Sequence, residues 1–153
     1  MGNTFRLFTD GGARGNPGPA GIGVVLESPD GEALEEIARG IGWATNNVAE
    51  YEALIIGLQA ARVHAATDLE VFLDSTLVIE QMKGNYKVKS PRLKTLHDRA
   101  RSLAQEFTRI SFTSVPRAQN KHADRLSNLG MDQQAASGEP LPPQPGPNQT
   151  GLF

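Results

Sequence analysis

The chain has 153 residues, 39% of them hydrophobic and 21% charged, a composition typical of a soluble globular protein with one core. It contains no cysteine, which excludes disulfides and thiolate metal sites. No apolar run approaches the roughly 18 residues that span a bilayer, and the N-terminus lacks the apolar core of a signal peptide. These features predict a cytoplasmic protein, while the net charge of −2 favours no particular partner.

Charge is distributed unevenly along the chain. The segment 83–101 carries seven basic side chains against the single acid Asp98, and the segment 27–36 carries acids but no base. A nearly neutral protein can bind a polyanion through one basic segment, so residues 83–101 are a candidate contact for nucleic acid.

The first predicted element is a strand over residues 4–10, which brings Asp10 to its C-terminal end. Gly11 and Gly12 follow, and a second break falls at residues 15–18. Glycines permit tight turns and let the backbone of another molecule approach closely. An acid beside such a loop suits a metal ion that must meet a large ligand, although Asp-Gly is also an ordinary turn sequence.

Two further strands, 22–26 and 33–42, form a predicted hairpin around a Pro-Asp-Gly turn. A helix follows over residues 46–62, where apolar residues recur at helical spacing. Its first turn contains Glu50, which a capping box explains equally well if Asn47 is the N-cap.

The remaining elements alternate between strands and helices. They are a strand over 69–74, helices over 77–82 and 91–107, a strand over 110–115, and a loop that enters a last helix over 117–130. Asp74 closes the first of these strands, and its alternative role is the N-cap of the next helix. Prolines gather from residue 133 onward, so we expect a folded domain over 1–132 and a Pro/Gly-rich flexible C-terminal tail over 133–153.

The order β-β-β-α-β-α-α-β-α predicts an α/β fold, a mixed sheet with helices packed on its faces. Sites in such sheets gather near the carboxyl ends of parallel strands. If the first and fourth strands are adjacent, Asp10 and Asp74 lie side by side, and Glu50 and Asp124 can reach the same cleft. Four carboxylates together are costly unless cations neutralise them, and oxygen ligands suit Mg²⁺ or Mn²⁺. Two such ions can promote phosphodiester hydrolysis.

Four segments resemble, in order and spacing, the successive motifs of the type 1 ribonuclease H family, across residues 4 to about 131. They are 9–19 (TDGGARGNPGP), 45–54 (TNNVAEYEAL), 74–75 (DS) and 120–126 (NKHADRL). The resemblance implies the ribonuclease H-like fold, a five-stranded mixed sheet of three antiparallel and then two parallel strands flanked by helices. It implies a catalytic domain over 1–132 that hydrolyses the RNA strand of RNA–DNA hybrids endonucleolytically. The implied ends are 5′-phosphate and 3′-hydroxyl, and the implied use is primer or R-loop removal.

The resemblance also implies roles for particular residues. Two Mg²⁺ ions, with Mn²⁺ as a substitute, would be held by the four catalytic acids Asp10, Glu50, Asp74 and Asp124. The hybrid would be contacted by Gly11, Gly12, Asn16, Thr45, Asn46, Asn47 and Ser75. Of these, Thr45 would bind a DNA phosphate, and the asparagines would lie in the minor groove, where RNA displays its 2′-hydroxyls. Capping is the alternative role for the asparagines.

The chain departs from the best-known bacterial pattern of this family at two functional segments. The basic protrusion is missing, and only residues 83–90 stand in its place, where Lys87 and Lys89 either grip the substrate or form a solvated basic loop. The loop histidine expected before the last acid is also absent. Arg117 stands nearby as a candidate for leaving-group or product release.

The tail supplies a separate hypothesis. Gln149, Leu152 and Phe153 resemble the peptide by which bacterial replication proteins dock on the sliding clamp, and a proline-rich tether suits such docking. The alternative is an uncommitted tail. Rival functions for the whole chain are a non-catalytic hybrid-binding module, a tail-tethered replication adaptor and an exonuclease of the same superfold. We expect a monomer.

Overall fold

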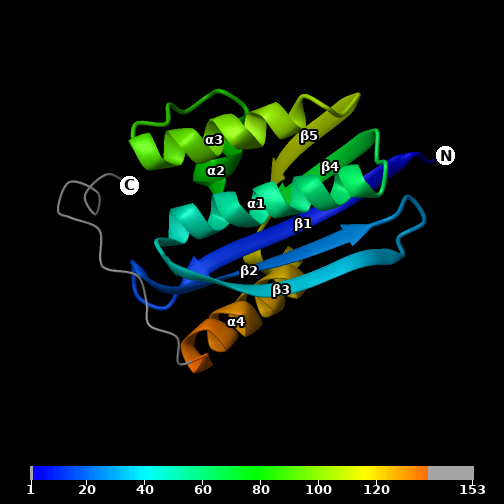
Figure 1. Cartoon of the computed structure of the whole chain (residues 1–153). Coiled ribbons are helices and arrows are strands. Elements are labelled where there is room, and N and C mark those ends of the chain that lie inside the picture. Colours follow the sequence, from blue (N-terminus) through cyan, green and yellow to red (C-terminus); the bar gives the residue numbers. More distant parts are fainter. Residues whose placement is uncertain (1, 138–153) are drawn as a thin grey trace.

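The chain forms a five-stranded mixed sheet, assembled from both halves of the sequence (Figure 1). Its strands are β1 (Thr4–Ala13), β2 (Gly18–Glu27), β3 (Ala33–Ala44), β4 (Asp68–Leu73) and β5 (Arg109–Ser114), in the spatial order β3-β2-β1-β4-β5. The pairs β1–β2 and β2–β3 are antiparallel, whereas β1–β4 and β4–β5 are parallel. This computed structural model, which describes residues 2–137, confirms the predicted fold class.

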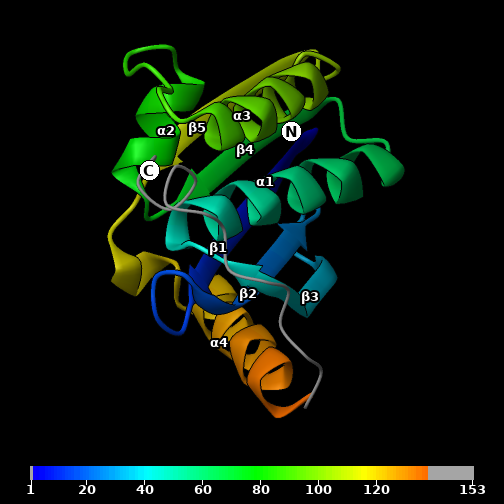
Figure 2. The same cartoon turned by 60° about the vertical axis from the view of Figure 1, so that its left-hand side comes forward.

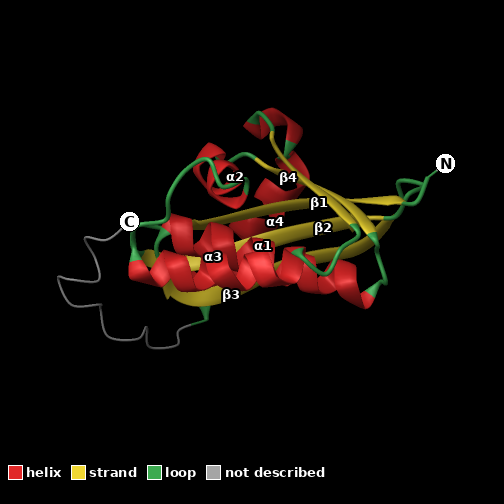
Figure 3. Cartoon of the chain, turned by 90° about the horizontal axis from the view of Figure 1, so that it is seen from above, coloured by secondary structure: helices red, strands yellow, loops and turns green. Residues whose placement is uncertain are grey.

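Helices cover both faces of the sheet. They are α1 (Asn46–Val63), α2 (Thr76–Met82), α3 (Pro91–Ala104) and α4 (Lys121–Ala136), and a short 3-10 turn, η1 (Arg117–Gln119), precedes α4. Figure 2 shows α1, α2 and α3 on one face and α4 alone on the other. The helices α1 and α3 lie side by side across the sheet (Figure 3). Within residues 2–137, no helix is long and apolar enough to cross a membrane.

Strand β2, next to the central strand β1, is buried because helices cover it from both sides. Its apolar run includes Ile22, Val24 and Leu26, which are all completely buried, as expected of a strand with no solvent-facing side. On one face, Leu54 and Leu58 of α1 complete the core and are equally buried. The apolar run therefore places β2 in the core between α1 and α4, and the polar acids lie at the carboxyl end of the parallel strands β1 and β4.

Several elements run further than the sequence predicts, β1 and α4 among them. Strand β1 continues past Asp10 to Ala13, because β2 pairs with it along this whole stretch. Helix α4 continues to Ala136, so the predicted boundary at residue 132 lies inside it and a tail that begins at 133 is wrong. The polar end of α4 is held by Gln134, whose Oε1 accepts a hydrogen bond from the Gly42 N–H at 2.9 Å.

Helix α4 lies unusually close to the sheet because glycines face it. A Cβ on Gly23 would lie 2.1 Å from the Ala123 carbonyl oxygen and 2.6 Å from the Ser127 nitrogen. Gly21 faces the next turn of the helix in the same way. These contacts set the first turn of α4, which carries Asp124, directly against β2.

We expect the Gly23→Ala substitution to destabilise the protein by about 3 kcal/mol, because backbone atoms of α4 must move to admit the methyl group. Gly31→Ala is the matched control: Gly31 has φ +87° and no atom within 4 Å of an added Cβ, so only backbone strain of about 1 kcal/mol is expected. Urea unfolding measures both. An equal decrease in the free energy of unfolding for the two variants would contradict close packing of α4 on β2.

Candidate active site

Three carboxylates from separate elements meet at the carboxyl end of the parallel strands. Asp10 lies in β1 two residues beyond the last parallel pair, Phe8 with Phe72. Asp74 directly follows β4, and Glu50 projects from the second turn of α1. Each of the three acids offers one oxygen, and these oxygens all lie within 4.8 Å of one another. The group can hold a cation, and we call it the acid cluster.

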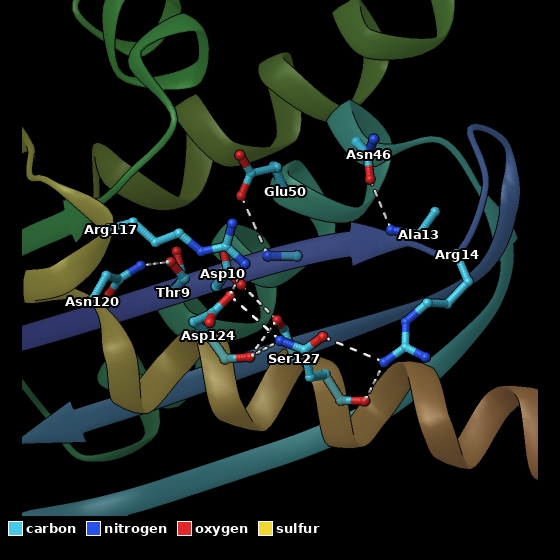
Figure 4. A network of polar contacts seen from close by, with 12 residues as sticks. Thr9, Asp10, Ala13, Arg14, Asn46, Glu50, Arg117, Asn120, Asp124 and Ser127 are labelled. Atoms are coloured by element: carbon cyan, nitrogen blue, oxygen red, sulfur yellow. Dashed lines mark hydrogen bonds and ion pairs between the residues drawn. The ribbon is translucent and has the colours of Figure 1, made fainter.

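The fourth predicted acid, Asp124, lies beside this cluster but is engaged elsewhere. It occupies the first turn of α4, and its Oδ1 accepts a hydrogen bond from Nη2 of Arg117 at 3.1 Å. Figure 4 shows Asp124 next to Asp10, with the Arg117 guanidinium reaching over both. The structure therefore brings together three of the four predicted acids and pairs the fourth with the predicted arginine.

Burial and mutual repulsion make the charged forms of these acids costly. Burial, followed by the charges of Asp74 and Asp124, raises the pKa of Asp10 to about 7. Burial, with the charges of Asp10 and Asp74, raises the pKa of Glu50 to about 8. Burial also raises the pKa of Asp74, although Arg117 opposes this. Bound divalent cations would remove the repulsion, and an all-oxygen set of ligands suits Mg²⁺.

Hydrogen bonds from residues that the sequence analysis missed hold the acids in place. The Ser127 hydroxyl donates to Oδ2 of Asp10. The Asn120 side chain, which is 1% exposed, donates to the Thr9 carbonyl at 3.0 Å and also hydrogen-bonds Asp74. Ser127 lies three residues after Asp124, on the same face of α4, and that spacing is the one signal that could have predicted it.

An open cleft of about 830 Å³ contains the acid cluster. Its lining combines the four acids with backbone and side chains of β1, α1, α4 and the segment after β5. Beyond the acids it consists of Gly11, Gly12, Ala13, Arg14, Asn46, Thr76, Ser114, Val115, Pro116, Arg117, Asn128 and Met131. Of the predicted nucleic-acid contacts, Gly11, Gly12 and Asn46 line the cleft, whereas the others lie outside it.

Gly11 is required by α1 rather than by a tight turn. A Cβ at this position would lie 2.2 Å from the carbonyl oxygen of Ala49, so only glycine allows the helix to approach β1. The Gly11 N–H then donates to Oε1 of Glu50 at 3.3 Å. Gly12 lies one residue further on, near the Met131 side chain. This close approach delivers Glu50 to the cluster.

The polar residues at the start of α1 hold the loops together. Thr45 is buried, and its hydroxyl accepts a hydrogen bond from the Val48 N–H, so Thr45 is the N-cap and the alternative in which Asn47 caps the helix is wrong. Oδ1 of Asn46 accepts from the Ala13 N–H at 2.8 Å, and Oδ1 of Asn16 accepts from the Asn46 N–H at 3.0 Å. The proposed contacts of these residues with substrate remain predictions.

Glu50 and Asp74 do not serve as caps, contrary to their alternative roles. Glu50 is bound to Gly11 and receives a hydrogen bond from Ser75, so no capping box forms. The N-cap of α2 is Ser75, whose hydroxyl accepts from the Val78 N–H at 3.3 Å, which leaves Asp74 directed at the cluster.

Lys87 and Lys89 are exposed in the loop after α2, away from the lining of the cleft. This loop is fastened by Gln81, whose Nε2 donates to the Lys87 carbonyl at 3.2 Å. Oε1 of Gln81 in turn accepts from the Tyr51 hydroxyl at 2.6 Å, and Tyr51 is completely buried beside Glu50. The basic loop is thus connected to α1 through a buried network.

Comparisons with known proteins agree with this fold. A family model described as "Reverse transcriptase-like" matches residues 8–130. A bifunctional protein of Mycobacterium tuberculosis is 53% identical over 132 residues, which cover 86% of this chain and 36% of that protein. The structure of its N-terminal RNase H domain matches with a TM-score of 0.86 and 50% identity, covering 89% of this chain and 99% of that domain. The ribonuclease HI of Halobacterium salinarum is 45% identical over 86% of this chain and 66% of its own length.

A third similar protein is an RNase H1 from compost, whose structure was solved in complex with an RNA/DNA hybrid. It is 42% identical, has a TM-score of 0.81, and the match covers 86% of this chain and 99% of that chain. The chain therefore belongs to the ribonuclease H family. It spans about a third of the length of the mycobacterial protein and about two thirds of the haloarchaeal one.

The raised pKa values predict how stability depends on pH. Asp10 keeps its proton up to pH about 7 when folded but loses it near pH 4 when unfolded, so stability falls as the pH rises between these values. In chelator, we expect Asp10→Asn to raise Tm by about 5 °C at pH 8 but not at pH 4, because the amide carries no charge to bury. Asp30→Asn, in an exposed turn, is the control. Parallel Tm curves for wild type and Asp10→Asn would contradict the raised pKa.

Proposed function

We propose that this protein is an endoribonuclease that hydrolyses the RNA strand of RNA–DNA hybrids with the help of divalent metal ions. One observation carries the proposal: the carboxylates of Asp10, Glu50 and Asp74 converge within 4.8 Å in an open cleft. Membership of the ribonuclease H family, and a relative whose structure holds an RNA/DNA hybrid, support the choice of substrate.

The acid cluster fits divalent ions because its oxygens are close together and repel one another once ionised. We propose that Asp10, Glu50 and Asp74, joined by Asp124 when Arg117 moves away, hold two Mg²⁺ ions, with Mn²⁺ as a substitute. When bound, such ions make water a better nucleophile and neutralise the charge that develops on the leaving oxygen. Hydrolysis of this kind needs no covalent intermediate and leaves 5′-phosphate and 3′-hydroxyl ends.

The protein's own groups position the acids for this chemistry. Ser127 orients Asp10, and Asn120 orients Asp74. The N–H of Gly11 and the hydroxyl of Ser75 hold Glu50. Because the helices and strands fix these donors, the carboxylates are organised before substrate arrives.

Residues at the edge of the cleft are suited to recognise the hybrid. The backbone at Gly11 and Gly12 and the exposed amides of Asn46 and Asn16 suit hydrogen bonds with 2′-hydroxyls, which distinguish RNA from DNA. Asn47 would add a further contact in the minor groove. We further propose that Thr45 contacts a DNA phosphate and that Ser75, Lys87 and Lys89 contact the hybrid.

Arg117 is suited to product release. Its side chain is 74% exposed and is held only by Asp124 among the residues that the structure describes, so it can move towards a departing phosphate. An Arg117→Ala enzyme that showed no burst of product before slow turnover would exclude this role.

A non-catalytic hybrid-binding module is the rival function. Such a module gains nothing from three close carboxylates that repel one another and that would repel a polyanion. Raised pKa values at Asp10 and Glu50 instead mark a catalytic or metal-binding site.

The role of the tail rests on sequence alone, since Gln149, Leu152 and Phe153 lie outside the described residues. We propose that they dock on a sliding clamp and bring a cytoplasmic, monomeric enzyme to sites of primer and R-loop removal. A variant that ends at Gly138 should lose clamp binding and keep hybrid cleavage. Unchanged affinity for the clamp would remove the proposal.

We expect wild-type protein and Mg²⁺ to cut an end-blocked RNA–DNA hybrid into fragments with 5′-phosphates. Asp10→Asn should lose the activity by several orders of magnitude, because it disrupts the acid cluster, and Asp30→Asn should keep it. Gel analysis of labelled RNA measures all three. An exonuclease would leave the blocked hybrid intact, and so would a binding module, which would still bind it tightly in a filter-binding assay.

A further inference from the structure

Arg14 is a charged side chain of the cleft that the site as described does not use. It lies in the loop between β1 and β2 and lines the same cleft as the acid cluster. Its side chain is 46% exposed. Figure 4 shows it extending from this loop towards α4. A cation in this place needs an explanation, because the cleft is otherwise dominated by acids.

Contacts with α4 hold the guanidinium by one edge. Nη2 lies 2.8 Å from Oδ1 of Asp132 and 3.4 Å from Oδ1 of Asn128. Asn128 also donates to the Asp124 carbonyl at 2.9 Å, so Arg14 is tied to the turn that carries the fourth acid. Among the described residues, Nη1 and Nε of Arg14 make no hydrogen bond or ion pair, which leaves three N–H groups for a ligand.

The cations of the cleft stand on opposite sides of its acids. Of the residues that line the cleft, Arg14 and Arg117 are the basic ones. Figure 4 shows Asp10 and Asp124 between them. Arg117 is paired with Asp124, which belongs to the site, whereas the partner of Arg14 is Asp132, which does not line the cleft. Arg14 thus offers its charge to the cleft without neutralising an acid of the site.

We propose that Arg14 binds a backbone phosphate of the RNA strand, next to the phosphate that is cleaved. This inference rests on the proposed function, because the strand that lies across the acid cluster is the RNA strand. A guanidinium presents paired N–H groups that match two phosphate oxygens. Asp132 and Asn128 hold it in position before the strand arrives, which reduces the entropy lost on binding.

A purely structural role predicts a different behaviour. An exposed ion pair such as Arg14–Asp132 contributes little to stability, so its loss should change Tm slightly and substrate binding not at all. A phosphate contact should instead weaken hybrid binding and reduce its dependence on salt, because one fewer counterion is released.

The test compares Arg14→Ala with Arg62→Ala, both in the inactive Asp10→Asn background. Arg62 is a matched arginine, 59% exposed and 3.0 Å from Oε1 of Glu106, but it lies at the far end of α1 from the site. In Mg²⁺, we expect Arg14→Ala to raise the Kd for an end-blocked hybrid about 10-fold and to reduce the slope of log K against log salt by about 1. Arg62→Ala should leave both quantities unchanged. Arg14→Lys should keep the slope but bind less tightly, because it lacks the paired donors.

Neutral methylphosphonate linkages, placed one at a time along each strand, locate the contact. One position in the RNA strand should weaken binding by the protein that retains Arg14 but not by Arg14→Ala. Coupling to a DNA position, or equal Kd values for Arg14→Ala and Arg62→Ala, would overturn the inference. The proposed function fails separately, if the wild-type protein with Mg²⁺ does not cleave the hybrid, whether or not it binds it.

Discussion

Repulsion among Asp10, Glu50 and Asp74 is the constraint on which the rest of the structure depends. Three carboxylates can share 4.8 Å only if the elements that carry them are fixed from outside the site. Glycines provide much of this fixation: Gly11 lets α1 lie against β1, and Gly23 lets α4 lie against β2. The free-energy cost of ionising these acids is reflected in the raised pKa of Asp10 and of Glu50, and bound divalent cations would lower that cost.

The fold could be predicted because its information is local. Apolar runs such as residues 22–26 and the turn at 28–31 determine the strands and the hairpin, and helical spacing determines α1. The ends of elements could not be predicted, because distant partners set them. Helix α4 reaches Ala136 with Gln134 bound to Gly42, a residue 92 positions earlier, and composition alone suggested a tail there.

The acids of the site could be predicted because they lie in short sequence motifs, near the starts of α1 and α4, after the end of β4, and in β1, which continues three residues past Asp10. The groups that orient them could not, because their partners are remote in sequence: Ser127 lies 117 residues from Asp10. Local sequence patterns did not identify the helix cap, since the N-cap of α1 is Thr45 and not Asn47. The position of Arg14 could not be predicted either, because its side chain is held by Asp132 of α4, which is remote in sequence. Sequence motifs thus predicted which side chains carry the chemistry, whereas tertiary packing determines how these side chains are oriented.

The central claim is that this acid cluster keeps protons until divalent ions displace them. Calorimetric titration of Mg²⁺ at pH 7, in two buffers of different ionisation enthalpy, tests it most directly. At pH 7, a pKa of about 7 leaves Asp10 about half protonated and a pKa of about 8 leaves Glu50 mostly protonated, so saturable Mg²⁺ binding should release between about one and two protons per protein. Asp10→Asn should bind more weakly and release fewer protons. Identical heats in the two buffers, or no saturable binding, would contradict the account.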